Sequence, residues 1–190
     1  AQPGLCLVIT PLIALMKDQV RNLRDRGIKA VAIYSGMTRE EIVIALENCI
    51  FGDYKFLYIS PERLDSEIFQ IKLLSMKVCM ITVDESHCIS QWGHDFRPEY
   101  TQLKVLRQQF PNVPIVALTA TADKITRQDI VQQLAMKNPQ VFISSFDRPN
   151  LSLEVKRGYQ QKEKIRSILQ FIERHPGESG IIYCMSRNTT

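Results

Sequence analysis

Two adjacent acids, Asp84 and Glu85, follow directly on the apolar run Val78–Val83. Such a run is typical of a strand buried on both faces, and open α/β sheets bind ligands at the carboxyl ends of these strands. Neighbouring carboxylates repel each other and lose hydration unless a cation or a proton relieves them. In nucleotide hydrolysis, one acid holds Mg²⁺ on the phosphates and the next acts on the attacking water. The bare pair leaves two interpretations open, a Walker-B site of this kind and a solvated acidic turn.

Aromatic and charged side chains crowd the segment that follows the two acids. It contains the only tryptophan of the chain, at Trp92, and also His94, Phe96 and Arg97. Trp and Phe rings can stack on unpaired bases, and Arg can bind phosphate or stack as a cation. The segment therefore favours a loop that binds single-stranded nucleic acid over an aromatic plug against the edge of the sheet.

Short apolar runs alternate with helical periods along the chain, and these elements must position the two segments. Six runs are predicted as strands: 5–9, 30–34, 56–59, 78–83, 115–118 and 141–143. Helices are predicted from about Leu12 to Gly27, from the capping box of Thr38 and Glu41 to Gly52, over 67–74, from Pro98 to Phe110, and from Asp123 to Leu134. This alternation implies a parallel sheet with helices on both faces, which is an α/β fold.

Turn residues interrupt the alternation at 144–150. We expect a first lobe over residues 1–146, a linker over 147–150 and the start of a second lobe over 151–190. In the second lobe, strands are predicted at 151–155 and 180–184 and a helix at 162–173. This part of the chain is too short to bury a core of its own.

Composition narrows the class of protein. Apolar residues make up 45% of the 190 residues and charged residues 23%, which is typical of a soluble globular protein. No apolar run reaches the roughly 18 residues that span a bilayer, and the N-terminus does not resemble a signal peptide. The net charge of +4 permits a polyanionic partner without requiring one. The five cysteines lack the spacing of a metal site and indicate buried thiols.

The sequence Asp84-Glu85-Ser86-His87, with the segment 88–100, resembles motif II and the aromatic-rich loop of the RecQ-type DNA helicases. Further segments resemble motifs of that family in the same order: 10–19 (Ia), 58–64 (Ib), 117–122 (III), 145–150 (the interdomain crossing) and 180–187 (IV). The resemblance implies a RecA-like lobe and the start of a second RecA-like lobe. It also implies an ATP-dependent DNA helicase that moves 3′ to 5′, acts in DNA repair or recombination, and works in the bacterial cytoplasm at the nucleoid.

The resemblance further implies a role for each matching residue. Asp84 would hold Mg²⁺ through its water shell, Glu85 would act on the water that attacks ATP, and His87 would relay the state of the nucleotide to the loop. DNA binding or coupling is expected of Gln91, Trp92, His94, Phe96, Arg97, Thr10, Lys17, Ser35, Arg63, Thr119, Thr121 and Arg187. The family usually has Ala at the position of Ser86, and we expect this hydroxyl to find a local partner.

Other parts of such an enzyme have no counterpart in the sequence. No G-x-x-x-x-G-K-[ST] phosphate loop occurs, and the family's order places it before Ala1. An arginine finger and the family's zinc-binding and winged-helix modules are also missing, so zinc is expected only there. We therefore expect the chain by itself to hydrolyse no ATP, and the strand that carries Asp84 to have an uncovered edge. Two alternatives stay open: an RNA helicase of the same superfamily, and a non-catalytic module that binds nucleic acid.

Overall fold

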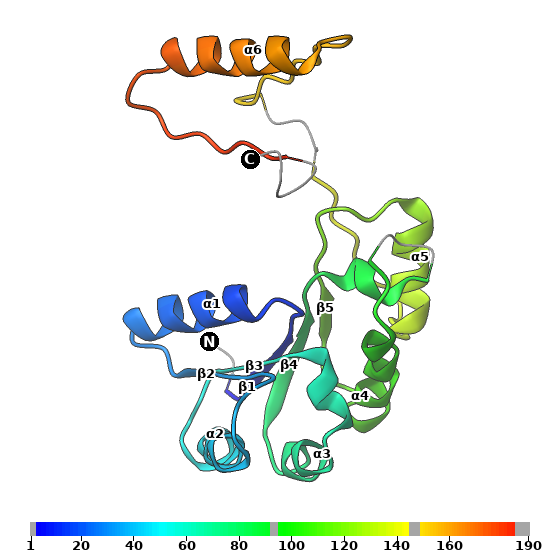
Figure 1. Ribbon diagram of the computed structural model, residues 1–190. Coiled ribbons are helices and arrows are strands. Elements are labelled where there is room, and N and C mark those ends of the chain that lie inside the picture. The colour runs from blue at the N-terminus through cyan, green and yellow to red at the C-terminus, as the bar shows by residue number, and fades with distance from the viewer. Residues whose placement is uncertain (1–2, 92–94, 145–148, 185–190) are drawn as a thin grey trace. The chain divides into compact units, whose positions relative to one another are not determined.

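The computed structural model describes residues 3–91, 95–144 and 149–184. The chain divides into two compact units, residues 1–141 and 142–190 (Figure 1). The division lies close to the predicted end of the first lobe at residue 146. Most of the segment that contains the predicted linker lies outside the described residues, so the exact extent of the two lobes and of the linker stays a prediction.

The first unit is built on a parallel sheet of five strands in the order β2-β3-β1-β4-β5. The strands are β1 (Leu5–Ile9), β2 (Ala30–Ile33), β3 (Phe56–Ile59), β4 (Val78–Val83) and β5 (Ile115–Ala117). The predicted parallel sheet is thus confirmed. The expected uncovered edge on the strand before Asp84 is wrong, because β4 pairs with β1 on one side and with β5 on the other. The edge strands of the described sheet are β2 and β5.

Helices cover both faces of this sheet, as the alternation predicts (Figure 1). On one face, α1 (Ile13–Asp25) packs Met16 and Val20 against Cys6 and Val8 of β1. On the other face, Leu7 and Ile9 of β1 lie in a larger core. The helices that contribute to that core are α2 (Arg39–Phe51), α3 (Glu67–Leu73), α4 (Leu103–Gln109) and α5 (Lys124–Gln133). Successive side chains of a strand point to opposite faces, so one continuous apolar run serves both cores.

Local capping fixes where two of the helices begin. Thr38 Oγ1 accepts from the backbone N–H of Glu41 over 3.2 Å, and Glu41 Oε2 accepts from the N–H of Thr38 over 2.8 Å, which confirms the capping box of α2. Asp123 Oδ1 accepts from the N–H of Thr126 over 2.7 Å at the start of α5. Pro98 opens a 3₁₀ turn, η3 (Pro98–Gln102), and α4 follows that turn, so the single helix predicted there is divided.

Three predicted strands do not form. Residues 141–143, 151–155 and 180–184 have no strand structure, and Phe142 is 91% exposed. Their β-rich composition is not sufficient, because a strand needs a neighbouring strand to take its hydrogen bonds. In the described part of the second unit the regular element is α6 (Gln161–Glu173), as predicted, and none of these residues is buried. No helix among the described residues is both long and apolar enough to cross a membrane.

Candidate active site

The two acids lie where the chain leaves β4 and turns sharply. Glu85 adopts a left-handed backbone conformation, with φ 47° and ψ 43°, before the 3₁₀ turn η2 (Ser86–Ile89). A residue other than glycine in this region costs on the order of 1 kcal/mol, and such strain is concentrated at functional sites. The turn is fixed by the backbone N–H of Ser86, which donates to the carbonyl oxygen of Leu118 over 2.9 Å. The strained turn thus joins the end of β4 to the segment that follows β5.

Asp84 is held by contacts on its backbone and on its side chain. Its N–H donates to the carbonyl of Ile9 over 2.9 Å, and its own carbonyl accepts from the hydroxyl of Tyr100 over 3.1 Å. The carboxylate oxygen Oδ1 accepts from the N–H of Glu85 over 2.9 Å, and Oδ2 accepts from Thr10 Oγ1 over 3.3 Å. Both carboxylate oxygens therefore have a fixed donor and keep further lone pairs for a ligand.

Thr10 does not lie on an accessible surface, although the resemblance implies that it binds DNA. Its side chain is completely buried, at 0% exposure, and its hydroxyl lies against Asp84. A contact between Thr10 and DNA, expected from the resemblance, requires an accessible side chain. The structure therefore places Thr10 beside the acid and not on an accessible surface.

His87 lies between the second acid and the segment after β5. Its Nδ1 lies 3.0 Å from Thr119 Oγ1 and 3.3 Å from Glu85 Oε2, and its Nε2 lies 3.8 Å from Asp95 Oδ2. The Thr119 hydroxyl also accepts from the backbone N–H of Thr121 over 3.3 Å. One imidazole ring thus contacts Glu85, the segment after β5 and the aromatic loop.

Two backbone hydrogen bonds connect residues of the aromatic loop, the segment 88–100. The N–H of Arg97 donates to the carbonyl of Cys88 over 2.9 Å, and the N–H of Tyr100 donates to the carbonyl of Arg97 over 3.0 Å. Gln91 is exposed, whereas Phe96 and Arg97 are half-buried. Trp92 and His94, which the sequence singles out, lie outside the described residues. The position of Tyr100 connects the end of the loop directly to Asp84.

Tyr100 is a contact that the sequence alone does not identify. It lies within the helix predicted from Pro98 to Phe110, and it is fully buried. Burial raises the pKa of the Tyr100 phenol far above its usual range, so the hydroxyl keeps its proton and donates. The residue type is the one signal in the sequence for this contact, because a buried tyrosine needs a partner for its hydroxyl and a phenylalanine does not.

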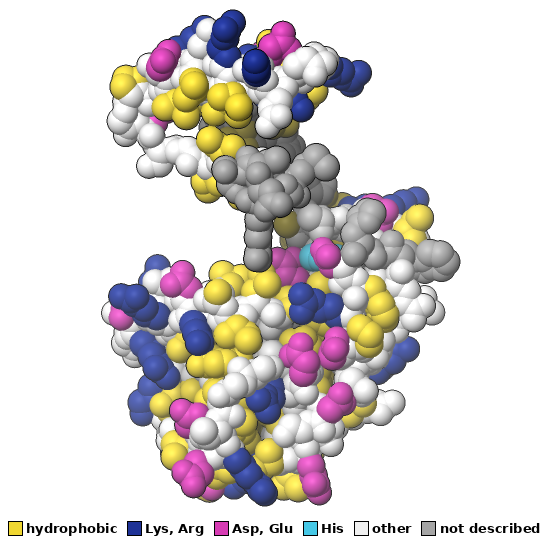
Figure 2. Space-filling view, in the orientation of Figure 1, with side chains coloured by type: hydrophobic (Ala, Val, Ile, Leu, Met, Phe, Trp, Pro, Cys, Tyr) yellow, Lys and Arg dark blue, Asp and Glu magenta, His cyan; other side chains and the backbone are white. Residues whose placement is uncertain are grey.

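A second group of predicted residues meets at the carboxyl end of β2. The Lys17 Nζ lies 4.5 Å from the centre of the Tyr34 ring, and Arg63 Nη2 donates to the carbonyl of Tyr34 over 2.9 Å. Ser35 follows Tyr34 and is exposed. Figure 2 shows basic, acidic and hydrophobic side chains interspersed over the visible face of the first unit, so charge alone does not mark a site there. Arg187 lies outside the described residues.

Ser86 does not find the local partner that we expect for it. Its side chain is fully buried, and its Oγ makes no hydrogen bond with any described residue. Ser60 Oγ, at the end of β3, is buried in the same way among the described residues.

The side chains at the end of β4 fit Mg²⁺ bound through one carboxylate. Among the described residues, no three His, Cys, Asp or Glu side chains gather into a protein-only metal site. Mg²⁺ is usually held by one or two carboxylates, together with phosphate oxygens and waters. Asp84, partly exposed and with both oxygens oriented, supplies a ligand of this type.

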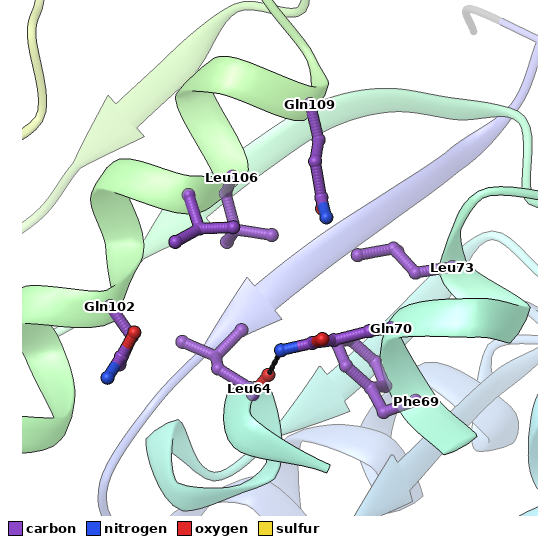
Figure 3. Close-up of a pocket in the computed structure, with 8 residues that line it drawn as sticks. Leu64, Phe69, Gln70, Leu73, Gln102, Leu106 and Gln109 are labelled. Carbon is purple, nitrogen blue, oxygen red and sulfur yellow. Dashed lines mark hydrogen bonds between the residues drawn. The ribbon is translucent and has the colours of Figure 1, made fainter. Parts of the chain in front are cut away.

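A small groove lies elsewhere, between the segment that contains α3 and the one that contains α4 (Figure 3). Its lining includes Leu64, Phe69 and Leu106, and on one side of it Gln70 Nε2 donates to the carbonyl of Leu64 over 2.8 Å. Its volume of about 10 Å³ is no more than a water molecule needs. None of the predicted site residues lines it, so the groove has no part in the candidate site.

Comparison with known proteins identifies the family. The chain is 50% identical over 185 residues to the "ATP-dependent DNA helicase RecQ" of Haemophilus influenzae, and 48% identical to the protein of the same name from Pasteurella multocida. Each comparison covers 97% of this chain, which spans 29% of each relative's length. The resemblance to the RecQ-type helicases is thereby confirmed.

A solved structure supports the fold alone. The crystal structure of the Pyrococcus furiosus Hef helicase domain is similar, with a TM-score of 0.51 at 14% identity, over 72% of this chain and 28% of that one. The RecA-like fold expected from the sequence is thus confirmed for the sheet and its helices. Residues 1–130 match the family described as "DEAD/DEAH box helicase". The chain therefore belongs to the DEAD/DEAH box helicase family.

Proposed function

We propose that the chain is part of an ATP-dependent 3′ to 5′ DNA helicase, in which it supplies the acid pair for ATP hydrolysis and the loop that senses DNA. The observation that carries the proposal is the position of His87, whose Nδ1 contacts both Glu85 Oε2 and Thr119 Oγ1. Such a contact lets a change at the acid pair reach the segment after β5. The names of the relatives, which are DNA helicases, support the assignment.

Each residue of the acid pair has a distinct role in this proposal. Asp84 would hold Mg²⁺ through its water shell, and the bound ion would neutralise charge on the phosphates. Glu85 orients the attacking water and accepts its proton, since a carboxylate within hydrogen-bond reach can act as a general base. The imidazole of His87 contacts the Glu85 carboxylate and restrains it. When the Glu85 side chain moves, the contacts of His87 change. The ring thereby passes the state of the site to Thr119 and Asp95.

DNA binding is assigned to two surfaces. Gln91, Trp92, His94, Phe96 and Arg97 form the single-strand sensor, in which aromatic rings stack on bases and Arg97 binds phosphate. Lys17, Ser35 and Arg63 contact the DNA backbone near Tyr34. The Lys17–Tyr34 and Arg63–Tyr34 contacts support this second surface, because they place two cations at the end of β2. Thr121 and Arg187 are proposed to couple the lobes.

The alternatives receive less support. An RNA helicase of the same superfamily would not be expected to carry the aromatic loop at 88–100, and the relatives named above are DNA helicases. A non-catalytic module would have no need of the strained turn at Glu85, or of the contacts that hold Asp84. We also propose a role in bacterial DNA repair or recombination at the nucleoid; the names of the bacterial relatives support the DNA helicase alone.

Steady-state ATP hydrolysis tests the proposal in the parent protein, by which we mean the full-length protein in which this chain occurs. We expect Mg²⁺-dependent hydrolysis that single-stranded DNA stimulates and single-stranded RNA does not. A strand-displacement assay with a 3′ overhang should show unwinding, and a duplex with a 5′ overhang should stay intact. Equal stimulation by RNA would favour the RNA helicase, and no hydrolysis at all would favour the binding module.

A further inference from the structure

Thr10 stands beside Asp84 because of the register of the sheet. Ile9 of β1 pairs with Val83 of β4, so the residues that directly follow the two strands, Thr10 and Asp84, continue the same row. The N–H of Thr10 donates to the carbonyl of Ile59 over 3.1 Å, which fixes its backbone against β3. Pro11 follows at once and has no N–H with which to continue the ladder. The position of the Thr10 side chain is therefore set by two neighbouring strands.

The hydroxyl of Thr10 restrains the carboxylate of Asp84. It donates to Oδ2 over 3.3 Å, while the N–H of Glu85 donates to Oδ1 over 2.9 Å. Two donors on different oxygens fix the plane of the carboxylate, which one donor would leave free to rotate. Thr10 is buried at 0% exposure, so the donor of this hydrogen bond is shielded from water, whereas its acceptor Asp84 is partly exposed.

We infer that Thr10 is a positioning residue, which orients the Asp84 carboxylate toward the Mg²⁺ of the bound nucleotide. The inference rests on the proposed function, because it needs Asp84 to hold the Mg²⁺. Groups that hydrogen-bond a metal ligand orient it, and their loss typically lowers metal affinity about 10- to 100-fold. Thr10 acts through Asp84 and touches neither the nucleotide nor the DNA.

The test compares Thr10→Val, which keeps the shape of the side chain but removes the hydroxyl, with Thr10→Ser, which keeps the hydroxyl. In the parent protein, Thr10→Val should raise the Mg²⁺ concentration for half-maximal ATP hydrolysis about tenfold. A second readout is the binding of a fluorescent ATP analogue, measured with Mg²⁺ and with EDTA. Thr10→Val should lose most of the gain in affinity that Mg²⁺ provides, and its affinity in EDTA should equal that of the wild type. Thr10→Ser should match the wild type in both measurements.

Several outcomes would overturn the inference. Equal losses of nucleotide affinity with and without Mg²⁺ would show a purely structural role for Thr10. Weaker binding of single-stranded DNA, with an unchanged Mg²⁺ dependence, would show that Thr10 contacts DNA after all. Should Thr10→Val fail to fold, as judged by circular dichroism, Thr10→Ala replaces it in the same comparison with Thr10→Ser.

The failure of the inference can be told apart from the failure of the proposed function. A wild-type parent protein that binds nucleotide equally well with and without Mg²⁺ contradicts the proposed function itself. A wild-type protein with the expected Mg²⁺ dependence, alongside a Thr10→Val variant that behaves identically, contradicts the role of Thr10 alone.

Discussion

The hydroxyl of Tyr100 donates a hydrogen bond to the backbone carbonyl of Asp84 over 3.1 Å. Tyr100 is the last residue of the aromatic loop, and within the loop the N–H of Arg97 donates to the carbonyl of Cys88. One hydrogen bond thus ties the end of the loop to the backbone of the proposed Mg²⁺ ligand. A loop that responds to the nucleotide site needs a direct contact with that site, and the hydrogen bond between Tyr100 and Asp84 is such a contact.

Replacement of Tyr100 by Phe keeps the buried ring and removes this hydrogen bond. We expect the free energy of unfolding to fall by about 1 kcal/mol, the usual contribution of one such bond. Urea denaturation of the wild type and the variant measures the difference. An unchanged midpoint would show that the Asp84 carbonyl finds another donor.

Replacement of Trp92 by Ala tests the aromatic loop as the sensor of single-stranded DNA. Hydrolysis of ATP in the absence of DNA should change little, whereas the stimulation by DNA and the unwinding should fall at least severalfold, because stacking on one base contributes about 1–3 kcal/mol. Hydrolysis is measured across a titration of single-stranded DNA. Stimulation equal to that of the wild type would instead assign the loop a structural role.

Replacement of Ser86 by Ala should make the protein more stable, by about 1 kcal/mol. The Ser86 hydroxyl is buried and has no partner among the described residues, and a buried hydroxyl without a hydrogen bond is unfavourable. The midpoint of urea unfolding measures the change. Ser75→Ala, at an exposed serine, is the matched control and should have almost no effect. A loss of stability in Ser86→Ala would reveal a partner for the hydroxyl.

The cap of α5 makes stability depend on pH. The hydrogen bonds from Thr126 to Asp123 hold the pKa of that carboxyl below its usual range. Because the pKa is lower in the folded state, the contribution is present above the unfolded pKa and is lost as pH falls through the folded pKa. Asp123→Asn keeps an acceptor but cannot titrate. The difference in unfolding midpoint between the wild type and Asp123→Asn should therefore shrink from about pH 7 to about pH 2. A constant difference would contradict the role of the charge.

The sequence predicted the elements that local chemistry determines. The apolar runs before Thr10 and Asp84 form central strands of the sheet, because a run with no polar interruption needs cover on both faces. Thr38 and Asp123 begin their helices as expected, because a cap depends only on residues within one turn. Such signals need no knowledge of distant contacts.

The sequence could not predict the contacts that depend on strand order. The hydrogen bonds of Asp84 to Thr10 and Tyr100 join residues 74 and 16 positions apart. The pairing of β1 with β4 decides the contact with Thr10, and the position of η3 decides the contact with Tyr100. A periodic pattern contains neither. The failed strand at 151–155 has the same origin, since composition cannot reveal whether a pairing partner is present.

The rate of ATP hydrolysis in a Glu85→Gln parent protein, with saturating single-stranded DNA, tests the central claim most directly. Gln keeps the size of the side chain and cannot accept a proton, whereas Asp84 keeps its contacts with Thr10 and the Glu85 backbone. We predict that hydrolysis falls at least 100-fold while the affinity for the Mg²⁺-nucleotide stays within about twofold of the wild type. Glu40→Gln, at an exposed acid of α2, is the matched control and should hydrolyse ATP normally. Near-normal hydrolysis by Glu85→Gln would contradict the assignment of Asp84 and Glu85 as the reaction centre.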